Sequence, residues 1–174
     1  MTSTTAAKVG GDGFHAASTE TDCVADILER ELDVTISDWL GLVEKEADLM
    51  RISLSFEERT GHLRTLLRDV IARLRLDTGT KAPVSIAASE HGKLRCEQGY
   101  TVAMVVDESR ILQVSIFSTL HKHQNLVEFS KLLPDVVTIA DEVDAQLKRQ
   151  VLCFLSEEDV EKREAVTSLP GKSF

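Results

Sequence analysis

The sequence predicts an all-α protein, a bundle of five to six helices with a four-helix core. Hydrophobic residues recur at helical spacing through most of the 174-residue chain. Aromatic residues make up only 5% of it and there are three prolines, so leucine, valine, isoleucine and alanine must build the core. A core of aliphatic side chains suits helices packed on helices. The length is enough for one domain that needs neither disulfides nor a structural metal.

Composition divides the chain into three parts. Residues 1–21 are rich in serine, threonine, alanine and glycine, which predicts a flexible N-terminal tail. Residues 22–155 carry the helical periodicity and are expected to form the domain. Residues 156–174 are polar and are expected to be a linker or tail, with the option that their first half continues as a helix toward an output domain.

The first two helices are expected at residues 22–46 and 55–74. Apolar residues recur at helical spacing in both. Ser55-Phe56-Glu57-Glu58 matches a capping box, in which the serine oxygen accepts from a backbone N–H and the glutamate reaches back to the start. A glycine-containing loop should follow at residues 77–82, and Pro83 fits the first turn of a third helix.

The second half of the domain is expected to hold three further elements. The third helix should end near Gly99, a residue suited to a left-handed C-cap. A fourth helix over residues 100–124 is apolar on nearly all sides, which predicts burial in the bundle or in an oligomer interface. A fifth element is expected at 126–133, and Pro134 should start a last helix that runs to Leu155.

Charge and cysteine content limit the classes of partner. The net charge of −9 argues against binding nucleic acid or an anionic membrane surface. No apolar run reaches the ~18 residues that a membrane span needs. Cys23, Cys96 and Cys153 are far apart, and no secretory signal precedes them, so we expect reduced thiols in a cytoplasmic protein.

The stretch from residue 87 to 108 places polar groups in an apolar helical region. His91 and Arg95 are one helical turn apart on one face, and Glu108 opens the next helix as their natural counter-charge. Gly92 lies in mid-helix, where glycine costs about 1 kcal/mol relative to alanine, which indicates close packing. Gly99 would form the turn between the two helices.

Three interpretations of His91 remain open. It could be a buried histidine in a structural Arg95–Glu108 pair that specifies helix packing. The same polar cluster could be a sensory element whose two states are biased by a ligand, pH or a partner. His91 could also relay a phosphoryl group, although Lys93 lies only two residues on, about 160° around the helix from it.

No motif with known catalytic mechanics occurs. None of the five histidines follows a glutamate by three residues, and His121 and His123 point apart on a helix, so neither a di-iron nor a zinc site is expected. Cys96 adjoins Arg95, but we interpret it as a small core residue and not as a nucleophile. We therefore expect no enzyme activity, no metal and no cofactor.

The pattern of His91, Gly92, Arg95, Gly99 and Glu108 resembles the N-terminal domain of RsbRD-type RsbT co-antagonists. The resemblance extends over residues 22–155. It includes a helix that ends near Trp39, a leucine at position 112, and Asp144 in a late helix that runs toward Phe154. Ser109 and Gln113 stand where the family commonly has an aromatic residue and an arginine.

This resemblance implies a signal-input and dimerisation module of a bacterial stress-response or two-component protein, such as the N-terminal part of a sensor histidine kinase. A homodimer is implied, acting on signalling partners or on a C-terminal output domain. The alternatives are a histidine phosphotransfer protein using His91 and a helical carrier that binds a small molecule between its helices.

Overall fold

A computed structural model describes residues 22–76, 80 and 83–167, and it is all-helical over those residues. The expected flexible tail at 1–21, most of the expected loop at 77–82 and the end of the expected polar tail lie outside them. The helices are α1 (Val24–Arg30), α2 (Leu32–Val43), α3 (Ala47–Met50), α4 (Phe56–Thr60), α5 (Leu63–Leu74), α6 (Ile86–Glu97), α7 (Val102–Lys122) and α8 (Phe129–Thr167), with a short 3-10 turn at Gln124–Leu126.

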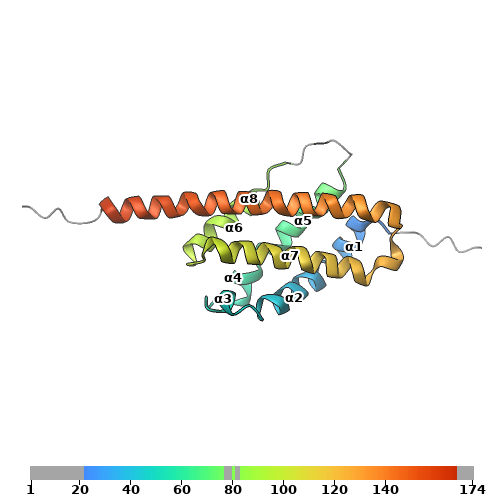
Figure 1. Cartoon of the computed structure of the whole chain (residues 1–174), viewed down its shortest axis with the longest axis horizontal. Helices are drawn as coiled ribbons and strands as arrows, with labels where there is room; N and C mark the ends of the chain where they lie inside the picture. The colour runs from blue at the N-terminus through green and yellow to red at the C-terminus, as the bar shows by residue number, and fades with distance from the viewer. Residues whose placement is uncertain (1–21, 77–79, 81–82, 168–174) are drawn as a thin grey trace, which may run out of the picture.

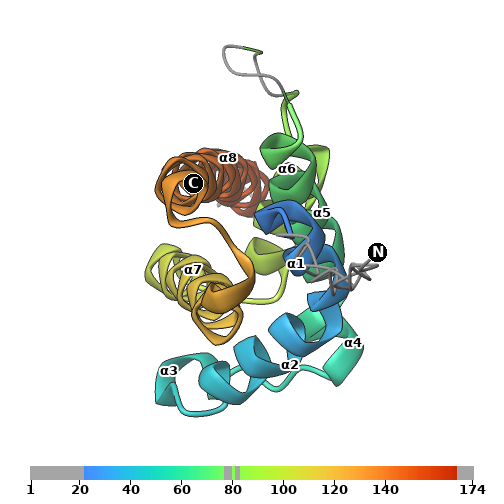
Figure 2. The ribbon, with the colours of Figure 1, turned by 90° about the vertical axis from the view of Figure 1, so that its right-hand side faces the viewer.

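The helices pack around one main core, so the predicted fold class is confirmed. Figure 2 shows α7 and α8 stacked along one side of the bundle, with α1, α5 and α6 on the other and α2 to α4 closing one end of that cross-section. Helix α6 packs chiefly along α8, and α7 packs along both α8 and α2. Fully buried side chains from most of these helices meet between the layers: Val24, Ile27, Leu28, Trp39, Leu49, Leu67, Val70, Val105, Ile116 and Ile139. No described helix is both long and apolar enough to cross a membrane.

The first predicted helix is divided at Glu31 into α1 and α2, which corrects the single helix expected at 22–46. The Thr35 hydroxyl donates a hydrogen bond to the Glu31 carbonyl oxygen at 2.9 Å, in competition with the backbone N–H of the same residue at 2.8 Å. Such back-bonding by threonine bends helices. The hydroxyl also contacts that of Thr119 in α7 at 2.8 Å, so the bend brings α2 onto α7.

The second predicted helix is likewise divided. Its start is as expected, because Ser55 and Glu58 form the predicted capping box. The helix then breaks between α4 and α5 at Gly61 and His62. Thr60 donates to the Phe56 carbonyl at 2.8 Å just before the glycine, so a back-bonded threonine and a weak helix former adjoin.

Two prolines are placed differently from the prediction. Pro83 precedes α6 rather than starting it, because Ser85 supplies the N-cap oxygen that accepts from Ala88 N–H at 3.0 Å. Pro134 lies inside α8, which joins the two elements expected at 126–133 and 134–155. It is the sixth residue of that helix and is exposed, so the carbonyl left without a partner, that of Ser130, can bond to water.

Helix α8 is the longest element. Its 39 residues span about 58 Å, against about 32 Å for the 21 residues of α7. Figure 1 shows its C-terminal end running on beyond the ends of α6 and α7. The first half of the expected polar tail therefore takes the helical option, through Thr167.

Candidate functional site

Glu108 is the centre of a buried polar cluster in α7. Its side chain is 3% exposed and accepts from three groups. Arg95 Nε donates to Oε2 at 2.8 Å, the Tyr100 hydroxyl donates to Oε1 at 2.8 Å, and His91 Nε2 lies 3.3 Å from Oε2. The predicted grouping of His91, Arg95 and Glu108 is therefore what the structure shows. We call these residues, with Tyr100 and Arg59, the Glu108 cluster.

Arg95 connects α6 to the segment around α4. Its side chain is wholly buried, and its remaining N–H groups donate to main-chain and side-chain oxygens. Nη2 donates to the Arg59 carbonyl at 2.9 Å, and Nη1 donates to the Glu58 carbonyl at 3.1 Å and to Gln98 Oε1 at 2.7 Å. The guanidinium also lies 4.8 Å from the centre of the Tyr100 ring. One cation thus satisfies carbonyls at the C-terminal end of α4.

Arg59 and Tyr100 are the members that sequence analysis missed. Arg59 Nη1 donates to the Tyr100 hydroxyl at 3.2 Å, and Nη2 donates to the Ile52 carbonyl at 2.8 Å. Burial and the neighbouring Glu108 charge raise the pKa of Tyr100 to about 12, so the phenol stays protonated and donates. The only available signal was that Tyr100 is the single tyrosine and directly follows Gly99.

A second layer of contact comes from α2. The indole Nε1 of the fully buried Trp39 donates to the main-chain carbonyl of Glu108 at 3.2 Å. The cluster therefore joins α4, α6 and α7, and Trp39 connects it to α2.

Glu108 is ionised and His91 is neutral in this environment. Although burial would raise it, the hydrogen bond from His91 and the charge of Arg95 hold the pKa of Glu108 below its usual value. Burial lowers the pKa of His91, against the opposing effect of Glu108. A neutral His91 that donates from Nε2 leaves Nδ1 as an acceptor, and that atom is buried with no hydrogen-bond partner. The His62 ring lies edge-on to the His91 ring, with ring centres 5.7 Å apart.

Gly92 and Gly99, both singled out in the sequence, occupy positions that disfavour any other residue. A Cβ on Gly92 would lie 2.2 Å from the Gln150 carbonyl oxygen of α8, so α6 and α8 approach at backbone distance. Gly99 has a φ of +77°. The Tyr100 N–H bonds to the Arg95 carbonyl at 3.0 Å and the Gly99 N–H to the Cys96 carbonyl at 2.9 Å, which is a Schellman motif. That turn places Tyr100 against the cluster.

The outlying positions of the resemblance are less uniform. Leu112 and Phe154 are buried in the main core. Asp144 is exposed on α8, whereas Glu142, two residues earlier, is buried. Ser109 is buried and Gln113 is partly exposed, and no hydrogen bond joins either side chain to the described part of the Glu108 cluster.

Three kinds of chemistry were considered from the sequence: phosphoryl transfer at His91, a reactive Cys96 thiol, and metal binding. A phosphoryl acceptor must be reached by a donor, and His91 is 4% exposed with its Nε2 facing Glu108, so the structure gives phosphotransfer no support. Cys96 lies in the main core. Within the residues that the structure describes, no three histidine, cysteine or acidic side chains gather closely enough to hold a metal ion. The cluster is built to join helices.

Comparison with protein-family models, with curated proteins and with solved structures finds no match for this chain.

Proposed function

We propose that this chain is a non-catalytic signal-input and dimerisation module of a signalling protein. The observation that carries the proposal is the length of α8, whose C-terminal end continues past the bundle as helix (Figure 1). An input module has to connect a responsive body to an output. A continuous helix provides a stiff connection, at about 1.5 Å per residue.

The Glu108 cluster supports the proposal that the helical bundle responds to a signal. It holds α6 to α7, and α6 is the helix that packs chiefly against α8. Buried polar networks have few alternative arrangements, so a change in one hydrogen bond shifts whole helices rather than one side chain. A displacement of α6 would act directly on α8 through the backbone contact at Gly92 and Gln150.

Exposed apolar residues near the end of α8 support a dimer interface. Leu152, Leu155 and Val160 are 54%, 42% and 45% exposed, within nine residues of one another. At 100° per residue they occupy one side of the helix, within an arc of about 140°. Apolar groups gathered on one side of a protruding helix indicate association with another surface.

The dimer is tested by sedimentation velocity across a concentration series. We expect a dimer at high micromolar concentration and a monomer for the double variant Leu152→Glu/Leu155→Glu. Val34→Glu is the matched control, because Val34 is equally exposed but lies on α2, and this variant should remain dimeric. A wild-type chain that stays monomeric at high micromolar concentration contradicts the proposed dimer.

The input role is tested by hydrogen exchange in the end of α8. Glu108→Gln removes the central charge of the cluster without a large change in shape, and we expect altered amide protection in residues 158–167. Glu97→Gln, at an exposed position of α6, is the control and should leave that protection unchanged. Unchanged protection in both variants would mean that the cluster does not act on α8.

A further inference from the structure

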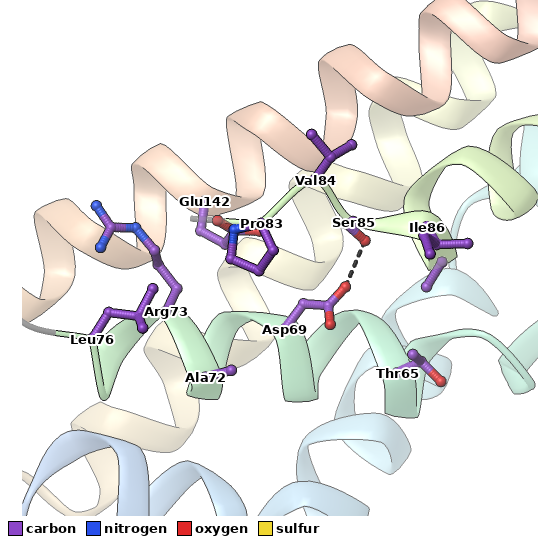
Figure 3. A pocket seen from close by; sticks show the side chains of 11 residues that line it. Thr65, Asp69, Ala72, Arg73, Leu76, Pro83, Val84, Ser85, Ile86 and Glu142 are labelled. Carbon is purple, nitrogen blue, oxygen red and sulfur yellow. Dashed lines mark hydrogen bonds between the residues drawn. The ribbon is translucent and has the colours of Figure 1, made fainter. Parts of the chain in front are cut away.

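A cavity of about 280 Å³ lies between α5, the segment leading into α6, and α8 (Figure 3). A smaller hollow of about 140 Å³ shares Pro83, Val84, Ser85 and Glu142 with it and extends to Gln146. Together they reach the lower end of the range for small-molecule sites, about 300–1,000 Å³. This region does not include the Glu108 cluster.

The walls of the cavity are mainly apolar. Figure 3 shows Ala72, Leu76 and Pro83 around it, with Val84 and Ile86 near its edge. Val84 and Ile86 are 60% and 73% exposed, so they leave apolar surface open to solvent. Ala87 also lines the cavity and belongs to a small apolar cluster, with Leu66 and Ala88, that is separate from the main core.

Glu142 is a buried acid in the wall of both hollows. It is 6% exposed, and its carboxylate accepts from Gln146 Nε2 at 3.2 Å. None of the ion pairs formed among the described residues involves it. Burial raises the pKa of Glu142, and the nearby Asp69 charge adds to the effect. A buried carboxylate is costly unless a cation or further donors reach it.

Gln146 supplies a second acceptor without a donor. The residue is 2% exposed, and its Nε2 donates both to the Leu66 carbonyl at 3.1 Å and to Glu142. Its amide oxygen, Oε1, is buried and has no hydrogen-bond partner. Glu142 and Gln146, one turn apart on α8, therefore place a carboxylate with a single donor and an amide oxygen with none beside the smaller hollow, and Glu142 also borders the larger cavity.

Arg73 lines the larger cavity and Arg149 lines the smaller hollow, but neither forms an ion pair or hydrogen bond with Glu142 or Gln146 among the described residues. Asp69 accepts from the Ser85 hydroxyl at 2.5 Å, at the N-terminus of α6, so it already faces donors of the protein. Arg73 lines the cavity, but Figure 3 shows its guanidinium group directed away from Glu142 and Asp69. The two carboxylates also disfavour an anion in the cavity.

We propose that this cavity binds a small molecule in which an amine is attached to a compact apolar body. The ammonium group donates to the Glu142 carboxylate and to Gln146 Oε1, while the apolar body lies against Ala72, Leu76 and Pro83. An ammonium group has three donors and a positive charge, which is what the two acceptors lack. The proposal concerns binding alone and does not depend on the signal-input role.

The test uses 2-phenylethylamine as the probe, with 2-phenylethanol and 3-phenylpropanoate as uncharged and anionic analogues. Each is titrated into the full chain and followed by amide chemical shifts. We expect saturable shifts around residues 69–76, 83–88 and 142–146 for the amine, affinity at least about tenfold weaker for the alcohol, and no saturation for the carboxylate.

Variants assign the contacts. Glu142→Gln should weaken amine binding at least about tenfold, because it removes the charge but keeps the shape. Asp144→Asn, which removes one negative charge from the exposed side of the same helix, should leave affinity unchanged. Ala72→Phe places a larger side chain in the cavity wall without altering Glu142 or Gln146, and it should weaken binding.

Three results would each overturn the proposal. They are equal binding of all three probes, an amine affinity that is the same in Glu142→Gln and wild type, and an amine affinity that is unchanged in Ala72→Phe. Should Glu142→Gln fail to fold, the analogue series and Ala72→Phe decide the matter. Failure here leaves the proposed dimer and input role standing, because sedimentation and hydrogen exchange measure those separately.

Discussion

Arg95 and Glu108 place opposite charges in the interior, where each would be costly alone. Taking two charges out of water costs several kcal/mol per ion, and mutual attraction repays this only when the remaining donors and acceptors are also satisfied. Arg95 meets that condition through carbonyls of Glu58 and Arg59, and Glu108 through Tyr100 and His91. The pair therefore specifies how α4, α6 and α7 meet more than it adds stability.

Protonation of His91 should destabilise the fold. In the unfolded chain a histidine takes up a proton near pH 6.5, whereas burial lowers the pKa of His91 in the folded chain. Below pH 6.5 the unfolded state binds more protons, so the free energy of unfolding falls with falling pH, by at most about 1.4 kcal/mol per pH unit from this residue. The contribution is complete above pH 6.5 and is lost toward acid.

Urea denaturation at a series of pH values checks this prediction. His91→Gln keeps a side-chain N–H for Glu108 but cannot take up a proton, so its stability should fall less than that of wild type between pH 6.5 and 5. His121→Gln controls for the removal of an imidazole at an exposed position. Parallel curves for His91→Gln and wild type would contradict a buried neutral His91.

Sequence spacing could predict three members of the cluster but not all five. His91 and Arg95 share a helix face, and Glu108 lies in the next helix, just beyond the chain reversal at Gly99. Local geometry therefore brings the three together. Arg59 comes from 36 residues before Arg95 and carries no pattern that separates it from a surface arginine. Only the packing of α4 against the turn after α6 shows its role.

At the scale of elements, the approach of α6 to α8 depends on one missing side chain. Gly92 faces the main chain of Gln150, and Ala88, one turn earlier on α6, is also small and fully buried. Small residues on one helix let the other come close, and the gain in packing offsets the low helix propensity of glycine.

Gly92→Ala should therefore destabilise the fold although alanine is the better helix former. The added Cβ would be 2.2 Å from a main-chain oxygen that cannot move without moving α8, and we expect a loss of about 1–3 kcal/mol. Thermal or urea unfolding measures it.

Gly41→Ala is the matched control, because a Cβ at Gly41 in α2 has nothing within 4 Å. This variant should gain up to about 1 kcal/mol from helix propensity alone. Equal effects of the two substitutions would mean that α6 and α8 are not in close backbone contact.

Helix boundaries were the least predictable feature at this scale. The capping box at Ser55 and the glycine cap at Gly99 could be predicted, since each rests on bonds within a few residues. The break at Glu31 could not, because Thr35 bonds the Glu31 carbonyl as part of its contact with α7. Pro134 was expected to start a helix, but it lies at an exposed position of α8, where water can replace the backbone hydrogen bond that the proline removes.

At the scale of the whole molecule, α8 belongs to the bundle for most of its length and then leaves it. Phe154 is its last buried core residue, and Lys93 of α6 still pairs with Glu157 at 2.9 Å. Beyond that point the side chains that the structure describes are exposed or half-buried.

Removal of residues 158–174 should change the free energy of unfolding by less than about 1 kcal/mol, because none of the described side chains in that stretch is buried. Phe154→Ala should cost about 3–5 kcal/mol. Both are measured through the fluorescence of Trp39, at a concentration where the chain is monomeric. A loss above about 2 kcal/mol on truncation would mean that the end of α8 packs on the bundle.

The sequence by itself determined the helical class, two of the caps and the grouping of His91, Arg95 and Glu108. These rest on periodicity and on bonds between residues close in the chain, where spacing alone fixes geometry. The tertiary structure decided where the helices bend, which arginine completes the cluster, and that Glu142 and Gln146 border a cavity. Those features depend on contacts between residues 36 to 84 positions apart, and their relative positions follow only from how the whole core packs.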